Sequence, residues 1–565
     1  MRKVLLVYLY GEGEAGISLA LGYLKAHADA DEEIRRTFSI EILHRCVTTD
    51  PRAVIHAIER CGAEVVGFSC YSWNYLAVSR IVSLLPARDR PLVVLGGVEV
   101  TPRPVAVLRE VPQADAVVVG EGEETFRDLL RRLAESLPDR AARNLAGIAG
   151  LVWRAGAAIR TNPPRPPILD LASIPSPYLA GSFGDELRRI KRVPLESTRG
   201  CPFRCAYCFE ARGFKRVRAF PLERVKAEVA HLVKLGVPEI EFFDTNVNYD
   251  RRRAAELFRF LGSVTKRVNF WFEFRAELLD AEQIQALAAL RFFAEAGLQT
   301  TNPRALQAVR RTFDREKFQA AITALMEASI YRPCAFSPRL GVMIDLIAGL
   351  PHDRVADVLR SFDFAFGLVP SKIAVSLMKL LPGTEVHEQA RRYRYEYDPH
   401  DNHVIRSSAT LSRAQVAELN GFSHAAYAAY NTIHAVRTIG WTATRLALQP
   451  SAVFLEIGRD ITRSGRPWEH YTVKDLSATL VRICREHGDE EAARQVVSKL
   501  VAETVLNVLQ KIREKRRSWW RRAVFAVGYR LLRRFGGLAP LPVAAAPEVR
   551  RERPPTRRAA PVHRT

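Results

Sequence analysis

The chain has 565 residues, of which 48% are hydrophobic and 26% charged, and this composition excludes a largely disordered or collagen-like protein. Its length allows two or three domains, and no run of about 18 apolar residues occurs, which argues against a membrane-spanning helix. The net charge of +22 is concentrated at one end, because residues 511–565 hold sixteen basic and three acidic residues, so the rest of the chain lacks the charge of a nucleic-acid-binding fold.

Short apolar strands alternate with helical segments over residues 1–150, which we assign to a first domain. The N-terminal apolar run is too short for a signal peptide, so we expect a buried first strand and a cytoplasmic protein. The expected strands are Val4–Leu9, Ile40–Leu43, Val65–Ser69, Leu92–Gly96 and Ala116–Val119, and the expected helices are Gly16–Ala28, Asp50–Arg60, Leu76–Leu85 and Glu124–Leu137. This alternation predicts an α/β fold with a doubly wound parallel sheet, which binds its ligand beyond the carboxyl ends of its strands.

A second alternating series follows a linker, expected at residues 151–190 because Arg154–Pro177 is rich in proline and polar residues. We assign residues 191–385 to the second domain. Its expected strands are Val193–Ser197, Ile240–Phe243, Asn269–Phe274, Ala294–Gly297, Gly341–Ile347 and Ile373–Leu377. Six β/α units predict a partial parallel (β/α)6 barrel with its chemistry at the carboxyl ends of the strands.

The remainder of the chain is expected to be helical and then basic. Residues 386–510 form a predicted helical domain, residues 511–538 a basic amphipathic helix, and residues 539–565 a disordered basic tail. The basic helix could cap the barrel, lie on an anionic membrane surface, or bind an RNA or an acidic peptide. The sequence leaves these alternatives open, with nucleic acid the least favoured partner.

Three of the eight cysteines stand together in STRGCPFRCAYCFE, where Cys201, Cys205 and Cys208 follow the pattern C-x3-C-x2-C. Three thiolates on one tight loop can hold three irons of a [4Fe–4S] cluster and leave the fourth iron open for a ligand. A zinc site would need a fourth cysteine or histidine nearby, and none follows. The spacing therefore favours an iron–sulfur cluster.

This motif resembles the hallmark of the radical S-adenosylmethionine (radical SAM) superfamily, C-x3-C-x-aromatic-C, with Tyr207 as the aromatic residue. The resemblance covers roughly residues 190–385. It implies that the open iron chelates S-adenosylmethionine and that an electron, delivered by a donor such as flavodoxin or ferredoxin, cleaves it to a 5′-deoxyadenosyl radical. That radical removes a hydrogen atom from an unactivated C–H bond.

The same resemblance implies contacts to S-adenosylmethionine from several strand ends. FFDTNVN stands where the family often has a Gly-Gly-Glu turn, so Asp244, Thr245 and Asn246 could supply polar contacts instead. Glu273 is expected in the barrel lumen, where it would bind the cofactor or form a structural salt bridge. Gln299 follows the fourth strand, where it would face the cofactor or belong to a polar turn.

Three strand ends of the first domain, in GFSCYSWN, LGGVEVTP and VVGEGEETF, resemble those of cobalamin-binding radical SAM proteins. Glycine-rich turns let a large planar ring approach the backbone closely. The candidate cobalamin contacts are Ser69, Trp73, Gly96, Gly97, Gly120 and Gly122. Trp73 could cover the lower face of the ring or simply pack. No Asp-x-His-x-x-Gly segment occurs in residues 1–150, so no histidine is expected as the lower ligand of cobalt.

These resemblances imply a cobalamin-dependent radical SAM enzyme that methylates an unactivated carbon of a small-molecule or peptide natural-product intermediate through methylcobalamin. One alternative is a cyclase or rearrangement enzyme with the same cofactors. A second is a methylthiotransferase, which would need another cluster, with Cys46, Cys61 and Cys70 as its only available ligands. A third is a non-catalytic iron–sulfur protein that binds RNA or a membrane through the basic tail.

Overall fold

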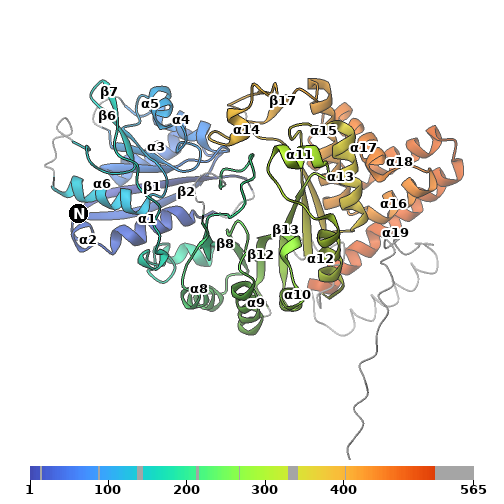
Figure 1. Cartoon of the computed structure of the whole chain (residues 1–565), viewed down its shortest axis with the longest axis horizontal. Coiled ribbons are helices and arrows are strands. Elements are labelled where there is room, and N and C mark those ends of the chain that lie inside the picture. The colour runs from blue at the N-terminus through green and yellow to red at the C-terminus, as the bar shows by residue number, and fades with distance from the viewer. Residues whose placement is uncertain are drawn as a thin grey trace, which may run out of the picture.

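The computed structural model describes residues 1–12, 16–86, 90–135, 144–210, 216–265, 267–328, 341–400 and 402–515, with side chains to residue 508. An N-terminal sheet domain, a central sheet domain and a helical region follow one another along the molecule (Figure 1). The predictions made for the chain beyond residue 515 lie outside the described residues. No helix in the described part of the chain is long and apolar enough to cross a membrane.

The first sheet has the strand order β2-β1-β3-β4-β5-β6-β7, and its first five strands are parallel, as predicted. These strands are β1 Arg2–Tyr10, β2 Phe38–Cys46, β3 Val65–Ser69, β4 Leu92–Gly96 and β5 Ala116–Val118. Helices α3 (Pro51–Cys61), α4 (Tyr75–Ser83) and α5 (Pro104–Glu110) cover one face, and α1 (Leu19–Asp29), α2 (Glu32–Thr37) and α6 (Glu123–Glu135) cover the other. Buried apolar clusters on both faces confirm the doubly wound fold.

The predicted linker is wrong in its first part. Strands β6 (Leu151–Ala155) and β7 (Ala158–Thr161) form an antiparallel hairpin that pairs with β5 and extends the first sheet. Its apolar residues Leu151, Val152 and Trp153 are buried, so the hairpin protects the edge of β5. The first domain therefore reaches residue 161, and the connection holds two short 3-10 turns, η2 (Leu171–Ser173) and η3 (Gly184–Arg188).

The second sheet has six parallel strands in the order β15-β14-β13-β12-β11-β8, which confirms the partial barrel. The strands are β8 Arg192–Leu195, β11 Glu239–Phe242, β12 Asn269–Phe274, β13 Phe292–Gln299, β14 Gly341–Ala348 and β15 Lys372–Leu377. The helices between them are α8 Leu222–Lys234, α9 Arg251–Val264, α10 Ala281–Ala288, α11 Pro303–Ala308, α12 Arg315–Ala328 and α13 Val355–Gly367. Short strands β9 (Thr198–Arg199) and β10 (Arg218–Ala219) pair beside the cysteine loop.

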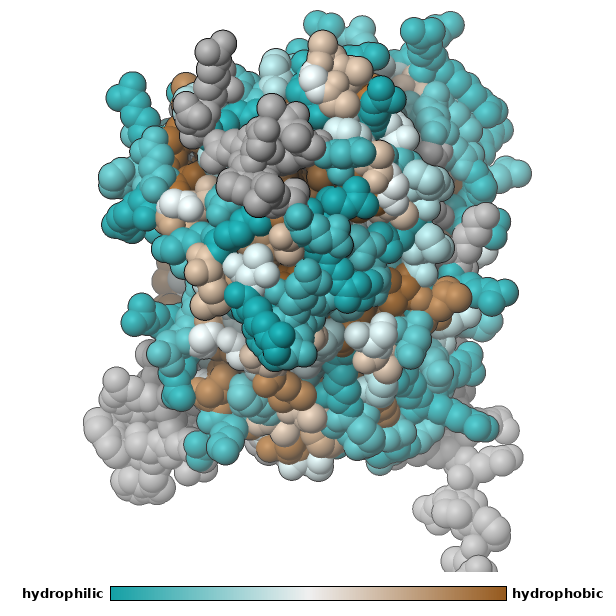
Figure 2. Space-filling view, turned by 90° about the vertical axis from the view of Figure 1, so that its left-hand side faces the viewer, coloured by the Kyte–Doolittle hydropathy of each residue, from teal (hydrophilic) through white to brown (hydrophobic). Residues whose placement is uncertain are grey.

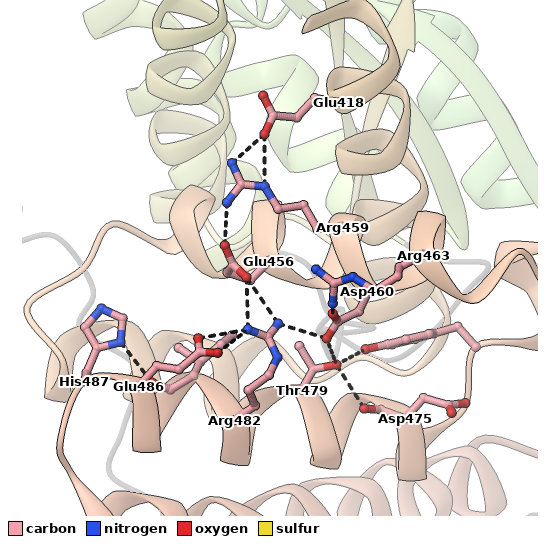
Figure 3. A network of polar contacts seen from close by, with 12 residues as sticks. Glu418, Glu456, Arg459, Asp460, Arg463, Asp475, Thr479, Arg482, Glu486 and His487 are labelled. Carbon is pink, nitrogen blue, oxygen red and sulfur yellow. Dashed lines mark hydrogen bonds and ion pairs between the residues drawn. The ribbon is translucent and has the colours of Figure 1, made fainter. Parts of the chain in front are cut away.

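The region after the barrel is mainly helical, as predicted. Its helices are α14 Glu385–Glu388, α15 Arg413–Ala425, α16 Val436–Arg445, α17 Pro450–Ser464, α18 Val473–Glu486 and α19 Glu490–Lys515, with a small hairpin of β16 (Glu396–Tyr397) and β17 (Ile405–Ser407). Arg459 and Arg482 bind glutamates and an aspartate of α15, α17 and α18 in one network (Figure 3). Several linked charges hold helices together better than isolated surface pairs do.

One apolar core runs from α1 through the barrel to α19, so the central sheet domain and the helical region are packed as a unit. The end of the molecule away from the helical region is formed by the first domain. Its surface shows mostly hydrophilic residues with small separate apolar groups (Figure 2). The internal cavities, described below, are therefore the natural places to look for ligand sites.

Candidate functional site

The cysteine loop follows β8 and opens into the barrel lumen. Cys201, Cys205 and Cys208 line a single cavity of about 560 Å³ together with residues from four barrel strands. Burial raises the pKa of the Cys201 thiol, and it raises the pKa of the Cys208 thiol to about 12. Metal binding at these thiols would therefore release protons.

The three thiols fit a cluster better than a single ion. Throughout the described residues, no three histidine, cysteine, aspartate or glutamate side chains converge on one metal position. A zinc site needs such convergence, whereas a cubane cluster binds each cysteine through a different iron. The soft thiolate donors and the adjoining cavity suit a [4Fe–4S] cluster with one iron open.

Asp244 braces the strand that leads into the cysteine loop. Its fully buried carboxylate accepts hydrogen bonds from the backbone N–H groups of Ser197 (2.6 Å) and Thr198 (3.2 Å) and from both hydroxyls. Asp244 does not line the cavity. The cofactor contact predicted for it does not fit this structure, because the carboxylate is already used within the loop.

The other predicted S-adenosylmethionine contacts do line the cavity of the cysteines: Tyr207, Thr245, Asn246, Glu273 and Gln299. The Thr245 hydroxyl donates to the carbonyl of Gly200 at 3.0 Å, so it also supports the loop. Gln299 has a left-handed backbone (φ 67°) at an irregularity of β13, so its side chain departs from the regular alternation of the strand. Their cofactor roles remain predictions.

Arg311 is a site residue that the sequence analysis missed. Its guanidinium lies 3.9 Å from Cys205 Sγ and 3.4 Å from Tyr207 Oη, and it donates to the carbonyl of Gly297. A cation beside a cluster thiolate stabilises its negative charge. Arg311 comes from the loop between α11 and α12, where no local motif marks it.

A second cavity of about 630 Å³ lies at the carboxyl ends of the first sheet. All six predicted cobalamin contacts line it: Ser69, Trp73, Gly96, Gly97, Gly120 and Gly122. A Cβ atom on Gly97 would lie 2.4 Å from the carbonyl oxygen of Cys70, so this turn has no room for a side chain. The missed residue Tyr71 stacks on Trp73 with ring centroids 4.4 Å apart. The bare backbone and the aromatic pair suit a large flat ligand.

The two cavities adjoin. Glu210, Glu241, Phe243 and Thr245 line both of them. Phe243 keeps 53% of its surface exposed although it is apolar. A molecule at this junction would touch the cysteine cavity and the glycine cavity at once.

Buried charges join the two domains beside this junction. Arg199, two residues before Cys201, pairs with Glu121 (3.1 Å) and Glu123 (2.7 Å) of the first domain and with Glu196 (2.9 Å) of its own. Arg218 also pairs with Glu121, at 2.8 Å. The sequence analysis used this part of VVGEGEETF only for its glycines, so the interdomain role of its glutamates was missed.

The cysteines that a methylthiotransferase would need are not placed to bind a second cluster. Cys70 is fully buried in the apolar core of the first domain, and its thiol lies 3.8 Å from the carbonyl of Phe68. Cys46 contacts the hydroxyl of Thr48 at 3.1 Å. These placements weigh against a second cluster in the first domain.

Two family models match the chain: the B12 binding domain over residues 14–130 and the radical SAM superfamily over residues 195–365. An "uncharacterized methyltransferase" of Pyrococcus horikoshii is 26% identical over 67% of this chain and 79% of its own length. The cobalamin-dependent radical SAM methyltransferase TokK of Streptomyces tokunonensis is 26% identical over 54% of this chain, and the match spans 46% of TokK.

Solved structures show the same fold. The cobalamin-dependent S-adenosylmethionine radical enzyme OxsB aligns over 96% of this chain and 85% of its own, with a TM-score of 0.57 and 14% identity. The radical S-adenosylmethionine methyltransferase TsrM of Kitasatospora setae aligns over 69% of this chain and 76% of its own, with a TM-score of 0.55 and 19% identity. These alignments and the two family matches confirm the predicted fold class.

Proposed function

Because this chain belongs to the radical SAM superfamily and carries an N-terminal B12-binding domain, we propose that it methylates an unactivated carbon of a small-molecule or peptide natural-product intermediate. Its two domains identify a [4Fe–4S] cluster, S-adenosylmethionine and cobalamin as its cofactors. The observation that carries the proposal is the junction of the two cavities. A substrate there would meet both cofactor sites without leaving the protein.

The two cavities would bind different cofactors. When bound, the cluster and S-adenosylmethionine supply a hydrogen-abstracting radical, and cobalamin supplies the methyl group. Cys201, Cys205 and Cys208 would hold the cluster, and Arg311 would balance the charge of Cys205. The glycine turns at the ends of β4 and β5 would admit the flat ring of cobalamin. Phe243 would keep water from the reacting carbon at the junction.

The relatives support a methyltransferase more than a cyclase. The methyltransferases of Pyrococcus horikoshii and Streptomyces tokunonensis are both 26% identical to this chain, and the first matches the larger share, 67% of the chain against 54%. The anaerobic magnesium-protoporphyrin IX monomethyl ester cyclase of Cereibacter sphaeroides is 24% identical over 56% of it. A rearrangement without methyl transfer is the second candidate, and it would yield product of unchanged carbon count.

The first test is reconstitution under anaerobic conditions with iron, sulfide and hydroxocobalamin, followed by desalting, absorption spectroscopy and metal analysis. We expect about four irons and near-stoichiometric cobalt per chain. The Cys201→Ala/Cys205→Ala/Cys208→Ala variant should lose the iron and keep the cobalt. Iron without retained cobalt would overturn the methyl-transfer proposal, and failure of the reduced protein to cleave S-adenosylmethionine would favour a non-catalytic iron–sulfur protein.

Two partners remain part of the proposal. A flavodoxin or ferredoxin would deliver the electron that the cluster needs. The basic segment 511–538, with its tryptophans and arginines, would bring the protein to an anionic membrane surface. Sedimentation with phosphatidylglycerol vesicles should retain the full chain and release a chain that ends at residue 515. Equal sedimentation of the two would contradict the membrane contact.

A further inference from the structure

The barrel lumen contains three carboxylates that have no partner among the described residues. Glu273 of β12, Glu295 of β13 and Asp345 of β14 come from three adjacent strands, and Glu273 and Glu295 stand at the same level of the sheet. All three line the cavity of the cysteines. Within the described residues, the structure gives none of the three carboxylates a hydrogen bond or an ion pair.

Two cations, Arg192 and Lys372, act on the charge of Glu295, but within the described residues neither forms an ion pair with it. Arg192, close to Glu295, already pairs with Glu239 (3.3 Å) and Glu241 (3.7 Å), and its guanidinium lies over the ring of Trp271. Arg311, the cation that acts on Asp345, is held by Cys205 and by the carbonyl of Gly297 in β13. Enclosed carboxylates are costly unless a cation or a hydrogen-bond donor compensates them.

The electrostatics agree with this picture. Glu273 is accessible from the cavity although protein surrounds it, and burial together with the charge of Glu295 raises its pKa to about 8. Burial and the neighbouring Glu241 raise the pKa of Glu295 to about 7. Burial also raises the pKa of Asp345, and the charges of Glu295 and Glu273 add to this effect. The protein alone therefore stabilises these charges poorly.

A separate observation indicates that a ligand enters the same cavity. Asn246 is only 5% exposed and lines the cavity, yet neither its amide oxygen nor its amide nitrogen has a hydrogen-bond partner. Buried amides in folded proteins are almost always hydrogen-bonded.

We propose that the lumen binds the substrate through a protonated amine or guanidinium group, held by the carboxylates of Glu295 and Asp345. The inference rests on the proposed function, because it takes the junction of the two cavities as the place of the reacting carbon. Glu241 lines both cavities, so it joins the lumen to this junction. A substrate anchored by its cation in the lumen would extend its apolar part past Phe243 toward the glycine cavity.

The test compares cations with neutral molecules of the same shape. Butylguanidine is paired with butylurea and phenethylamine with 2-phenylethanol, and binding is measured by calorimetry and saturation-transfer NMR. The protein is the reconstituted holoenzyme saturated with S-adenosylhomocysteine, which fills the site of S-adenosylmethionine. We expect each cation to bind at least tenfold more tightly than its neutral partner. Equal affinity within both pairs would overturn the inference.

Variants locate the binding. Glu295→Gln/Asp345→Asn should lose at least tenfold in affinity for the cations and leave the neutral molecules unchanged, whereas Glu282→Gln on the exposed face of α10 should change neither. The single variant Glu295→Gln serves if the double variant fails to keep its iron and cobalamin. Cation binding that survives loss of these carboxylates would also overturn the inference. If the protein retains iron and cobalamin but binds cations and neutral molecules equally, the cationic substrate is rejected and the methyl-transfer proposal stands. If it binds cations selectively but does not retain cobalt, methyl transfer is rejected and the cation site stands.

Discussion

Asp244 shows how one side chain can prepare a cofactor site without touching the cofactor. It is fully buried and satisfies four donors of Ser197 and Thr198, just before the cysteines. The loop that carries Cys201 therefore depends on a carboxylate that lies 47 residues after Ser197 in the sequence.

Replacing Asp244 by Asn should loosen this loop, because an amide nitrogen cannot accept the bonds that the second carboxylate oxygen accepts. We expect the free energy of unfolding to fall by about 1–3 kcal/mol and the iron content after reconstitution to drop. Thermal unfolding and iron analysis measure the two effects. The control is Asp314→Asn, which changes an exposed carboxylate before α12; equal iron content in both variants would contradict the bracing role.

The lumen glutamates should make stability depend on pH. The folded protein raises the pKa of Glu273 from 4.5 to about 8 and that of Glu295 from 4.5 to about 7. Between pH 4.5 and about 8, the folded protein therefore binds more protons than the unfolded chain. The free energy of unfolding falls as the pH rises through this range. Without S-adenosylmethionine, Glu273→Gln should raise the melting temperature by a few degrees at pH values above this range and change it little near the lower end. An equal shift at both ends would contradict this account.

At the scale of single elements, the turn between β4 and α5 combines a strained backbone with close contact. Gly97 has φ +114°, and its backbone packs against that of Cys70 at the edge of the second cavity. Gly96 and Gly97 therefore present bare backbone to the cavity, beside the stacked rings of Tyr71 and Trp73.

Gly97→Ala should distort this wall and weaken cobalamin retention several-fold, because strained positions of this kind cost roughly 1–3 kcal/mol. Cobalt remaining after desalting, at increasing dilution, measures the effect. Gly62→Ala is the matched control, since Gly62 also has positive φ (65°) but has nothing within 4 Å of an added Cβ. If Gly62→Ala lost as much cobalt as Gly97→Ala, general destabilisation would be the cause.

At the scale of the whole molecule, buried ion pairs connect the first domain to the rest of the chain. Glu99, in the turn after β4, accepts from His403 Nε2 at 3.0 Å, and Arg103 lies 3.1 Å from the same carboxylate. Both Glu99 and His403 are almost fully buried. Together with Arg199 and Arg218, this pair fixes the glycine cavity against the barrel.

Weakening this connection should let the first domain move away and release cobalamin faster. Glu99→Gln and His403→Gln should each increase the rate of cobalamin loss, and their double-mutant cycle should give a coupling of about 0.5–3 kcal/mol in thermal unfolding. Glu110→Gln is the control, because the partners of Glu110, Arg103 and Tyr75, both lie within the first domain. Additive effects of the two substitutions would show that the pair is not coupled.

The strands and the two candidate sites could be predicted from the sequence, because each of them depends on a local pattern. The strands of both sheets follow from apolar runs separated by helical periodicity, and β3, β4 and β12 have the predicted bounds. The cysteine spacing identified the cluster site, and the strand-end glycines identified the second cavity, because each of these motifs is confined to a short segment of the chain. Residues 151–161 were wrongly assigned to the linker, since the proline content of the residues that follow outweighed a short apolar run whose partner strand is β5.

Only the tertiary structure decided which distant residues meet. Arg311 lies 106 positions from Cys205, and His403 lies 304 positions from Glu99, yet each pair is in contact. Each of the lumen carboxylates comes from a different strand, so no short window of sequence reveals that they line one cavity. The physical reason is the parallel sheet, which brings side chains from successive strands to one level while long helical connections separate them along the chain.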